Sequence, residues 1–240
     1  MARQGYRSLS VAEIRQRYLT EGSVPSSYIL SLMRKDRRRG VQRAYRILKK
    51  REAAGKAERY RLEKLLQREK QLWAEGRRAV AGVDEAGVGP LAGPVVAAAV
   101  IFRPGVKIKG LDDSKKLAPA TRRTLSREIQ DKAECYARGV AEVDEINSIN
   151  IYQASLRAMR RAVLSLAMKP DYLLVDARRL PDLKINQDAV IGGDRRHFSI
   201  AAASILAKTF RDRLMERLDR EHPGYGLARH KGYSTPEHQE

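Results

Sequence analysis

Three short apolar segments of this chain end in an aspartate, and this feature limits the fold more than any other. The segments are residues 79–84, 172–176 and 189–194, which end in Asp84, Asp176 and Asp194. Each has the length and apolar character of a buried strand. The same reasoning predicts further strands at 94–102 and 136–143 and helices at 150–168 and 197–218. Strands that alternate with helices indicate an α/β fold with a mixed sheet.

The aspartates point to a shared site, because functional groups gather at the strand ends of such sheets. Glu85 follows Asp84 directly, and glycines at 87 and 89 allow the backbone to bend there. Four carboxylates brought together repel one another, and a divalent cation relieves that repulsion. Oxygen ligands without cysteine favour Mg²⁺ or Mn²⁺, and two such ions about 4 Å apart can cut a phosphodiester. The residues alone leave a second interpretation equally open, in which each aspartate is a helix cap or turn residue.

Positive charge is concentrated in the first third of the chain. The 240 residues hold 48 Lys and Arg against 29 Asp and Glu, a net charge of +19, and residues 1–76 hold 20 of these basic residues against 8 acidic ones. Residues 1–76 are predicted to form a basic helical domain, in which Ser10 and Glu13 fit a capping box, and residues 77–240 the α/β domain. Such an excess favours a nucleic-acid partner, and the cluster of Arg37, Arg38, Arg39, Arg43, Arg46, Lys49 and Lys50 favours a phosphate-contacting surface, although a solvated helix face explains any single basic residue better.

Several classes of protein are not expected. The sequence has no apolar run of the roughly 18 to 20 residues that span a bilayer, and no membrane partner is predicted. The amino terminus lacks the apolar segment of a signal peptide, and Cys135 is the single cysteine. The sequence therefore predicts a cytoplasmic protein without a disulfide.

The α/β part carries a series of motifs that resembles a known family. Residues 82–100 read GVDEAGVGPLAGPVVAAAV, and DSKKL, DEIN, YLLVD, GD, SIAAASILAK, RDRLM and KGY follow in order up to residue 233. This series closely resembles bacterial ribonuclease HII. The resemblance implies a ribonuclease H-like fold, with a mixed five-stranded sheet flanked by helices, behind a small helical N-terminal domain.

The resemblance also implies the site. The family's catalytic, metal-binding carboxylates correspond to Asp84, Glu85, Asp176 and Asp194. Its substrate-binding residues correspond to Gly87, Val88, Gly89, Lys115, Ser204, Lys208 and Tyr233. Val88 departs from the family pattern, which has an arginine between two glycines that read the ribose 2′-hydroxyl; valine cannot contact a phosphate in this way.

The implied activity is a two-metal hydrolysis that cuts RNA in RNA–DNA hybrids, and also 5′ of ribonucleotides embedded in duplex DNA. The products would carry 5′-phosphate and 3′-hydroxyl ends. We expect a monomer, with recruitment by replication proteins such as a sliding clamp or a polymerase left open. Two alternatives remain: another carboxylate–metal nuclease of this fold, such as a resolvase, or a hybrid-binding protein with weakened junction activity because of Val88.

Overall fold

The computed structural model describes residue 6 and residues 8–239. The chain divides into two compact units, residues 1–61 and residues 62–240. This division falls earlier than the domain boundary at residue 76 that the sequence predicts. The reason is that Leu62, Leu65 and Leu66 are buried in the core of the second unit.

The first unit is helical. Its helices are α2 (Val11–Arg15), the π-helix η1 (Gln16–Thr20), α3 (Ser27–Lys35) and the first part of α4 (Arg39–Leu65). The predicted capping box at the start of α2 is confirmed, because the Ser10 hydroxyl accepts from the Glu13 amide and the Glu13 carboxylate accepts from the Ser10 amide. A small core that includes Ile14, Met33 and Val41 holds these helices together.

The second unit is built around a five-stranded sheet in the order β3-β2-β1-β4-β5. Its strands are β1 (Val80–Ala86), β2 (Val95–Ile101), β3 (Cys135–Ala141), β4 (Tyr172–Asp176) and β5 (Asn186–Val190). Its helices are α5 (Gln67–Ala74), α6 (Pro119–Lys132), α7 (Val143–Leu164), η2 (Gly193–Arg195), α8 (Phe198–Glu221), α9 (Leu227–His230) and α10 (Pro236–Gln239). Strand β1 is antiparallel to β2 and parallel to β4, so the predicted mixed sheet is confirmed.

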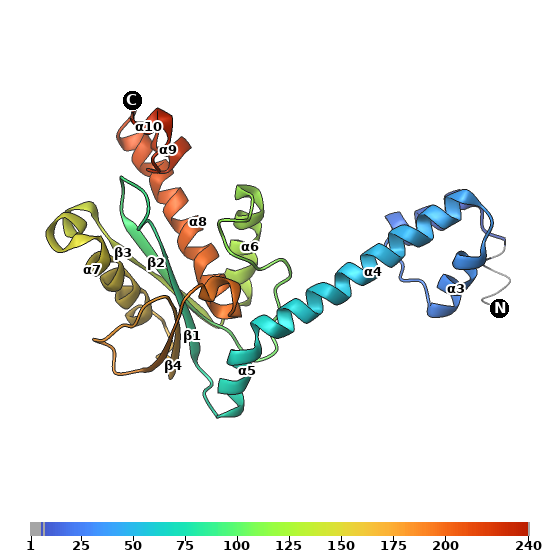
Figure 1. Cartoon of the computed structure of the whole chain (residues 1–240), viewed down its shortest axis with the longest axis horizontal. Helices are drawn as coiled ribbons and strands as arrows, with labels where there is room; N and C mark the ends of the chain where they lie inside the picture. Colours follow the sequence, from blue (N-terminus) through green and yellow to red (C-terminus); the bar gives the residue numbers. More distant parts are fainter. Residues whose placement is uncertain (1–5, 7, 240) are drawn as a thin grey trace. The chain divides into compact units, whose positions relative to one another are not determined.

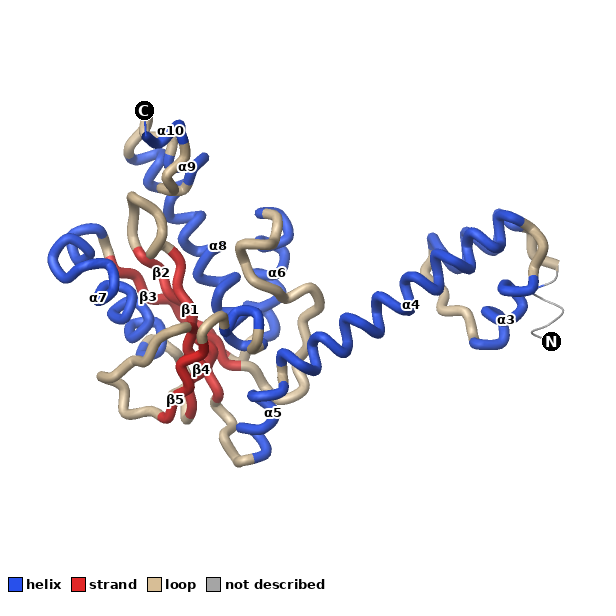
Figure 2. The backbone as a smooth tube through the Cα atoms, in the orientation of Figure 1, coloured by secondary structure: helices blue, strands red, loops and turns tan. Residues whose placement is uncertain are grey.

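Helices cover both faces of this sheet: α7 lies on one face, and α8, with α6 beside it, lies on the other (Figures 1 and 2). Alternate strand residues enter the two cores, with Val83 and Ala97 toward α7 and Ala98 toward α8. Gly82 lets α8 approach closely, since a Cβ there would lie 2.1 Å from the carbonyl carbon of Ser199.

Two expected elements differ from the sequence prediction. Helix α7 begins at Val143, after a capping box of Glu142 and Glu145, and is interrupted at Asn150, where φ is +69°. Strand β5 ends at Val190, so Asp194 lies in η2 and does not end a strand. The backbone leaves the sheet there because Gly192 adopts the left-handed conformation with φ +65°.

Among the described residues, no helix combines the length and apolar character needed to cross a bilayer.

Candidate active site

Strand β1 brings two acidic side chains to the centre of the sheet. Asp84 points to the α8 side and is buried, with 6% of its surface exposed. Its Oδ1 accepts a 2.7 Å hydrogen bond from the Glu85 amide, and the neighbouring Ser204 hydroxyl on α8 favours the ionised form of Asp84. Glu85 is the next residue and points to the opposite face, where its Oε1 lies 3.6 Å from Nη2 of Arg178. The two carboxylates therefore flank the end of β1.

Two more carboxylates lie at the same edge of the sheet. Asp176 ends β4, which runs parallel to β1, so the carboxyl ends of both strands meet. The Asp176 Oδ1 accepts a 2.7 Å hydrogen bond from the amide of Gly193, the residue before Asp194. This bond ties η2 to the end of β4 and brings Asp194 close to the strand ends.

The electrostatics of these four groups are unfavourable in the absence of a cation. Burial raises the pKa of Asp84 well above its usual range, and repulsion from Glu85 and Asp176 raises it further. Burial also raises the pKa of Glu85 and of Asp176. The pKa of Asp194 is raised by burial and then by repulsion from Asp113 and Asp176. Neighbouring carboxylates with raised pKa values are typical of functional sites.

The residues fit a hard divalent cation. Every donor in the set is an oxygen, and Oε2 of Glu85 is buried without a hydrogen-bond partner. In the part of the chain that the structure describes, no three acidic, histidine or cysteine side chains are already gathered as they are around a bound ion. Glu85 faces Arg178 and Asp176 is held by Gly193, so small side-chain rotations would be needed. The assignment of the four as metal ligands stays a prediction.

The loop before α6 adds a cation to this site. Lys115 is exposed, and its charge lowers the pKa values of Glu85, Asp176 and Asp194 slightly against the effect of burial. The loop is held by Asp113, whose Oδ1 accepts from the Lys115 amide at 2.9 Å.

Asp113 has a second contact that the sequence did not reveal. Its buried carboxylate accepts from Nε and Nη2 of Arg195 at 3.1 and 2.9 Å. Asp113 therefore holds the loop before α6 and also fixes η2 beside the site.

The predicted 2′-hydroxyl reader lies in the loop after β1. Gly87 has φ +112°, and a Cβ there would lie 2.6 Å from Nε of Arg211 and from the carbonyl oxygen of Pro94. Val88 is half-buried and packs against the core under α7. Gly89 is exposed, with open space around its Cα. The loop therefore leaves its backbone open at Gly89, whereas the Val88 side chain contributes to packing.

Arg211 on α8 holds this loop against the segment that carries Tyr233. It is fully buried, and its Nε and Nη2 donate to the carbonyls of Pro94 and Ala92 at 3.0 and 2.9 Å. Its Nη1 donates to the Lys231 carbonyl at 2.8 Å. The sequence pattern predicts no role for Arg211, although a basic residue on the apolar face of a helix is a usable signal.

Tyr233 and Lys208 lie together at the surface. Tyr233 is 38% exposed, and the Lys208 ammonium lies 5.2 Å from the centre of its ring. Lys208 is also ion-paired with Asp212, one turn further along α8. Ser204 lies one turn earlier but is buried, 3.0 Å from the Ser114 hydroxyl and behind Asp84. Lys208 is therefore already engaged by Asp212 and Tyr233, with 12% of its side chain exposed, and Ser204 lies too deep for a phosphate contact, so a phosphate-binding role for either stays a prediction.

Comparison with known proteins identifies the family. The family model described as Ribonuclease HII matches residues 81–240. The chain belongs to the ribonuclease HII family. The model of the ribonuclease HII N-terminal domain matches residues 10–73. Ribonuclease HII of Myxococcus xanthus is 50% identical over 230 residues, which cover 95% of this chain and 78% of that protein. Ribonuclease HII of Pelotomaculum thermopropionicum is 50% identical over 232 residues, 96% of this chain and 87% of that protein.

Solved structures agree with this assignment. Ribonuclease H2 of Pyrococcus horikoshii matches with a TM-score of 0.57 and 30% identity, over 66% of this chain and 82% of that chain. Ribonuclease HII of Archaeoglobus fulgidus, solved in complex with PCNA, matches with a TM-score of 0.54 and 28% identity, over 67% of this chain and 85% of that chain. The predicted ribonuclease H-like fold is confirmed.

The predicted activity is confirmed as well. The protein is an endonuclease that acts on RNA–DNA hybrids and on ribonucleotides embedded in duplex DNA. The resolvase-like and non-cutting alternatives are set aside.

Proposed function

We propose that Asp84, Glu85, Asp176 and Asp194 together hold two divalent cations, Mg²⁺ or Mn²⁺, at the carboxyl ends of β1 and β4. The observation that carries the proposal is the buried Asp84, whose pKa is raised by burial and by two neighbouring carboxylates. When bound by these residues, such cations would supply activation of the attacking water and stabilisation of the leaving 3′ oxygen, so that the products carry 5′-phosphate and 3′-hydroxyl ends. The Ser204 hydroxyl would favour the ionised form of Asp84, and the Gly193 amide fixes the orientation of Asp176.

We further propose that the loop Gly87–Val88–Gly89 contacts the ribose 2′-hydroxyl through its backbone. The open backbone at Gly89 supports this role, because a hydroxyl that donates and accepts separates RNA from DNA. Tyr233 would stack on the neighbouring sugar, with Lys208 beneath its ring. Lys115 would add positive charge near the scissile phosphate.

Val88→Arg tests how far the valine limits this reader. We expect the variant to cut a DNA duplex with one ribonucleotide about tenfold faster or more, because an arginine adds a charge-assisted phosphate contact. The assay compares both proteins, in Mg²⁺ and in Mn²⁺, on all-DNA, all-RNA, hybrid and single-ribonucleotide duplexes. The wild type should cut the hybrid and leave all-DNA intact. Equal single-ribonucleotide rates for both proteins would show that position 88 does not limit junction cleavage.

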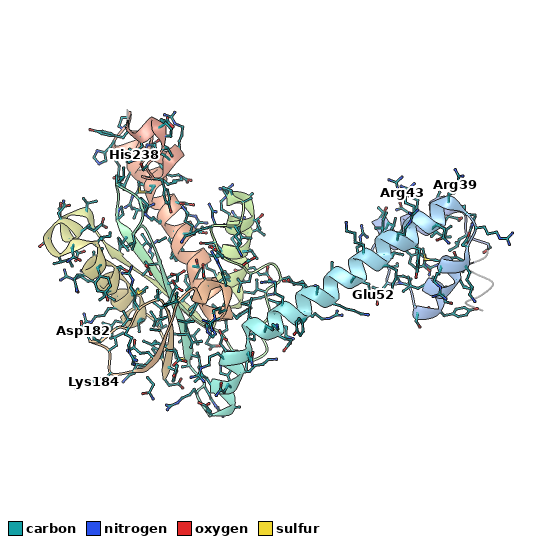
Figure 3. The ribbon with its side chains drawn as sticks, in the orientation of Figure 1. Arg39, Arg43, Glu52, Asp182, Lys184 and His238 are labelled. Carbon is teal, nitrogen blue, oxygen red and sulfur yellow. The ribbon has the colours of Figure 1, made fainter. Side chains whose placement is uncertain are left out.

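We propose that the basic helical unit binds the phosphate backbone of the nucleic acid. Arg39, Arg43, Arg46 and Lys50 are exposed and spaced four, three and four residues apart, so they share one side of α4. Figure 3 shows Arg39 and Arg43 projecting from this helix. None of the four is ion-paired with a carboxylate among residues 6 and 8–239, which leaves their charges available for phosphates.

The double variant Arg39→Gln/Arg43→Gln tests this surface. We expect a duplex to bind about tenfold more weakly, and the slope of log Kd against log salt to fall by about 0.9 for each lost phosphate contact. The measurement is fluorescence anisotropy over a range of salt concentrations. Its matched control is Arg78→Gln/Lys169→Gln, which removes two exposed charges just before β1 and β4, at the sheet edge opposite the carboxylates. Equal slopes for the two double variants would contradict a specific role for α4.

Recruitment by a ring-shaped replication protein is also proposed for this chain. The support is the solved complex of a 28% identical ribonuclease HII with PCNA. A monomeric state and a cytoplasmic location stay predictions from the sequence.

A further inference from the structure

The turn that follows β4 has an unusual backbone. The Arg178 amide donates to the carbonyl of Asp176 at 2.6 Å, which closes a three-residue turn. Its central residue, Ala177, has φ +53°, in the left-handed region that disfavours residues with a side chain. The Ala177 amide donates to the Val190 carbonyl on β5 at 2.9 Å, and this bond holds the turn in place. Strain of this kind is concentrated at functional sites, and here it determines where Arg178 points.

The turn directs Arg178 back toward the end of β1. Its Nη2 lies 3.6 Å from Oε1 of Glu85, which is an ion pair but too long for a hydrogen bond. Its Nη1 is buried and has no hydrogen-bond partner. The side chain remains 17% exposed, so it can be reached from solvent. A guanidinium with unused donors in a largely buried position is costly unless a ligand supplies acceptors.

An aromatic ring holds this guanidinium in place. The Arg178 guanidinium carbon lies 5.0 Å from the ring centre of Tyr152 on α7, within the range of a cation–π contact. Tyr152 is itself 52% exposed, so the pair lies at the surface beside Glu85. An aromatic contact fixes the position of the guanidinium and leaves its N–H donors free.

Arg178 differs from Arg211, whose role is structural. Arg211 is fully buried, and its Nε, Nη1 and Nη2 each donate to a backbone carbonyl. Arg178 makes no side-chain hydrogen bond within the described residues, although its charge lies beside a carboxylate of the site. Its donors are therefore arranged for an acceptor that the protein does not provide.

We propose that Arg178 is a substrate-contacting residue, which donates hydrogen bonds to the non-bridging oxygens of a phosphate next to the cleaved bond. The proposal rests on the proposed function, in which Glu85 is a ligand of the cations. When a cation takes up the charge of Glu85, Arg178 is left as a positive group facing the substrate backbone. The planar guanidinium then matches two phosphate oxygens at once.

Binding measurements with chemically altered duplexes test this proposal directly. A series of hybrids is prepared, each with one uncharged methylphosphonate at a different linkage around the cut site. The Kd of each hybrid is measured in Ca²⁺, under conditions without cleavage. For the wild type, we expect one linkage at which the substitution weakens binding about tenfold. For Arg178→Met, we expect the unmodified hybrid to bind about tenfold more weakly, and the effect at that linkage to disappear. Arg178→Lys should recover part of the affinity, because lysine keeps the charge but not the planar fork.

Arg179→Met is the matched control, since Arg179 is the next residue in the chain and is exposed. Its methylphosphonate pattern should equal that of the wild type. Thermal melting checks that each variant is folded. If Arg178→Met does not fold, Tyr152→Leu takes its place, and we expect it to weaken hybrid binding and to reduce the effect of the methylphosphonate at that linkage. If Arg178 serves only as the ion-pair partner of Glu85, Arg178→Met will lower turnover but keep the wild-type pattern of methylphosphonate effects on Kd. This outcome overturns the proposal. Because this readout is binding, it is separate from failure of the metal proposal, which would appear as cleavage by Asp84→Asn.

Discussion

Asp84→Asn is expected to lower the rate of hybrid cleavage by about three orders of magnitude or more while the protein still binds its substrate. Asparagine keeps the size of the side chain and can still accept the hydrogen bond from the Glu85 amide, but it removes the negative charge. Single-turnover cleavage with saturating enzyme measures the chemical step, and anisotropy measures binding. Cleavage at a near wild-type rate would show that Asp84 is not a ligand of the cations.

We also expect Asp84→Asn to change the thermal stability of the protein. Because burial and repulsion raise the pKa of Asp84, its ionised form destabilises the folded protein at neutral pH. Asp84→Asn should therefore raise the melting temperature in metal-free buffer and reduce the further rise that Mg²⁺ causes. Asp182→Asn is the matched control, since Asp182 is an exposed carboxylate in the loop after β4 (Figure 3). That control should leave both melting temperatures and the cleavage rate unchanged.

Gly82→Ala is expected to destabilise the protein by about 3 kcal/mol or more. The added Cβ would lie 2.1 Å from the backbone carbonyl carbon of Ser199, which cannot move unless α8 shifts away from the sheet. Helix α8 carries Ser204 and Lys208, so the shift would also disturb the site. Urea unfolding of the full chain, followed by circular dichroism, measures the change.

Gly89→Ala is the control for this substitution, because a Cβ at Gly89 meets no atom within 4 Å. Its unfolding midpoint should stay close to that of the wild type. If Gly82→Ala unfolds at the same urea concentration as Gly89→Ala, the close approach of α8 to β1 is not rigid.

Much of this architecture could be predicted because the sequence pattern is local. Apolar segments that end at Asp84 and Asp176 have the length of buried strands. Asp176 ends β4 as predicted, whereas β1 continues two residues past Asp84 to Ala86. Asp194 was placed at a strand end because the segment before it is apolar. The left-handed conformation of Gly192 instead starts η2, and a sequence does not show which glycine adopts that conformation.

The features that were missed depend on contacts between distant residues. Glu69 is a single acidic residue in a charged helix, yet it is 1% exposed and accepts from the amide and hydroxyl of Ser199 at 2.9 and 2.8 Å. This contact holds α5 against α8, so α5 lies in the second unit although it precedes residue 76, and the domain boundary at that residue stays a prediction. The positions of Arg178 and Arg211 could not be predicted for the same reason. A backbone turn after β4 directs Arg178, and the carbonyl groups that Arg211 binds belong to loops distant in the sequence.

The proposed binding of two cations by the four carboxylates is tested most directly by the positions of Mn²⁺ in a crystal of the wild-type protein with a hybrid that resists cleavage. Anomalous scattering identifies the manganese atoms without assumptions about the ligands. We expect two sites about 4 Å apart, coordinated by oxygens of Asp84, Glu85, Asp176 and Asp194 and facing the scissile phosphate. Manganese bound elsewhere, or these four carboxylates left without a bound cation, would contradict the proposal.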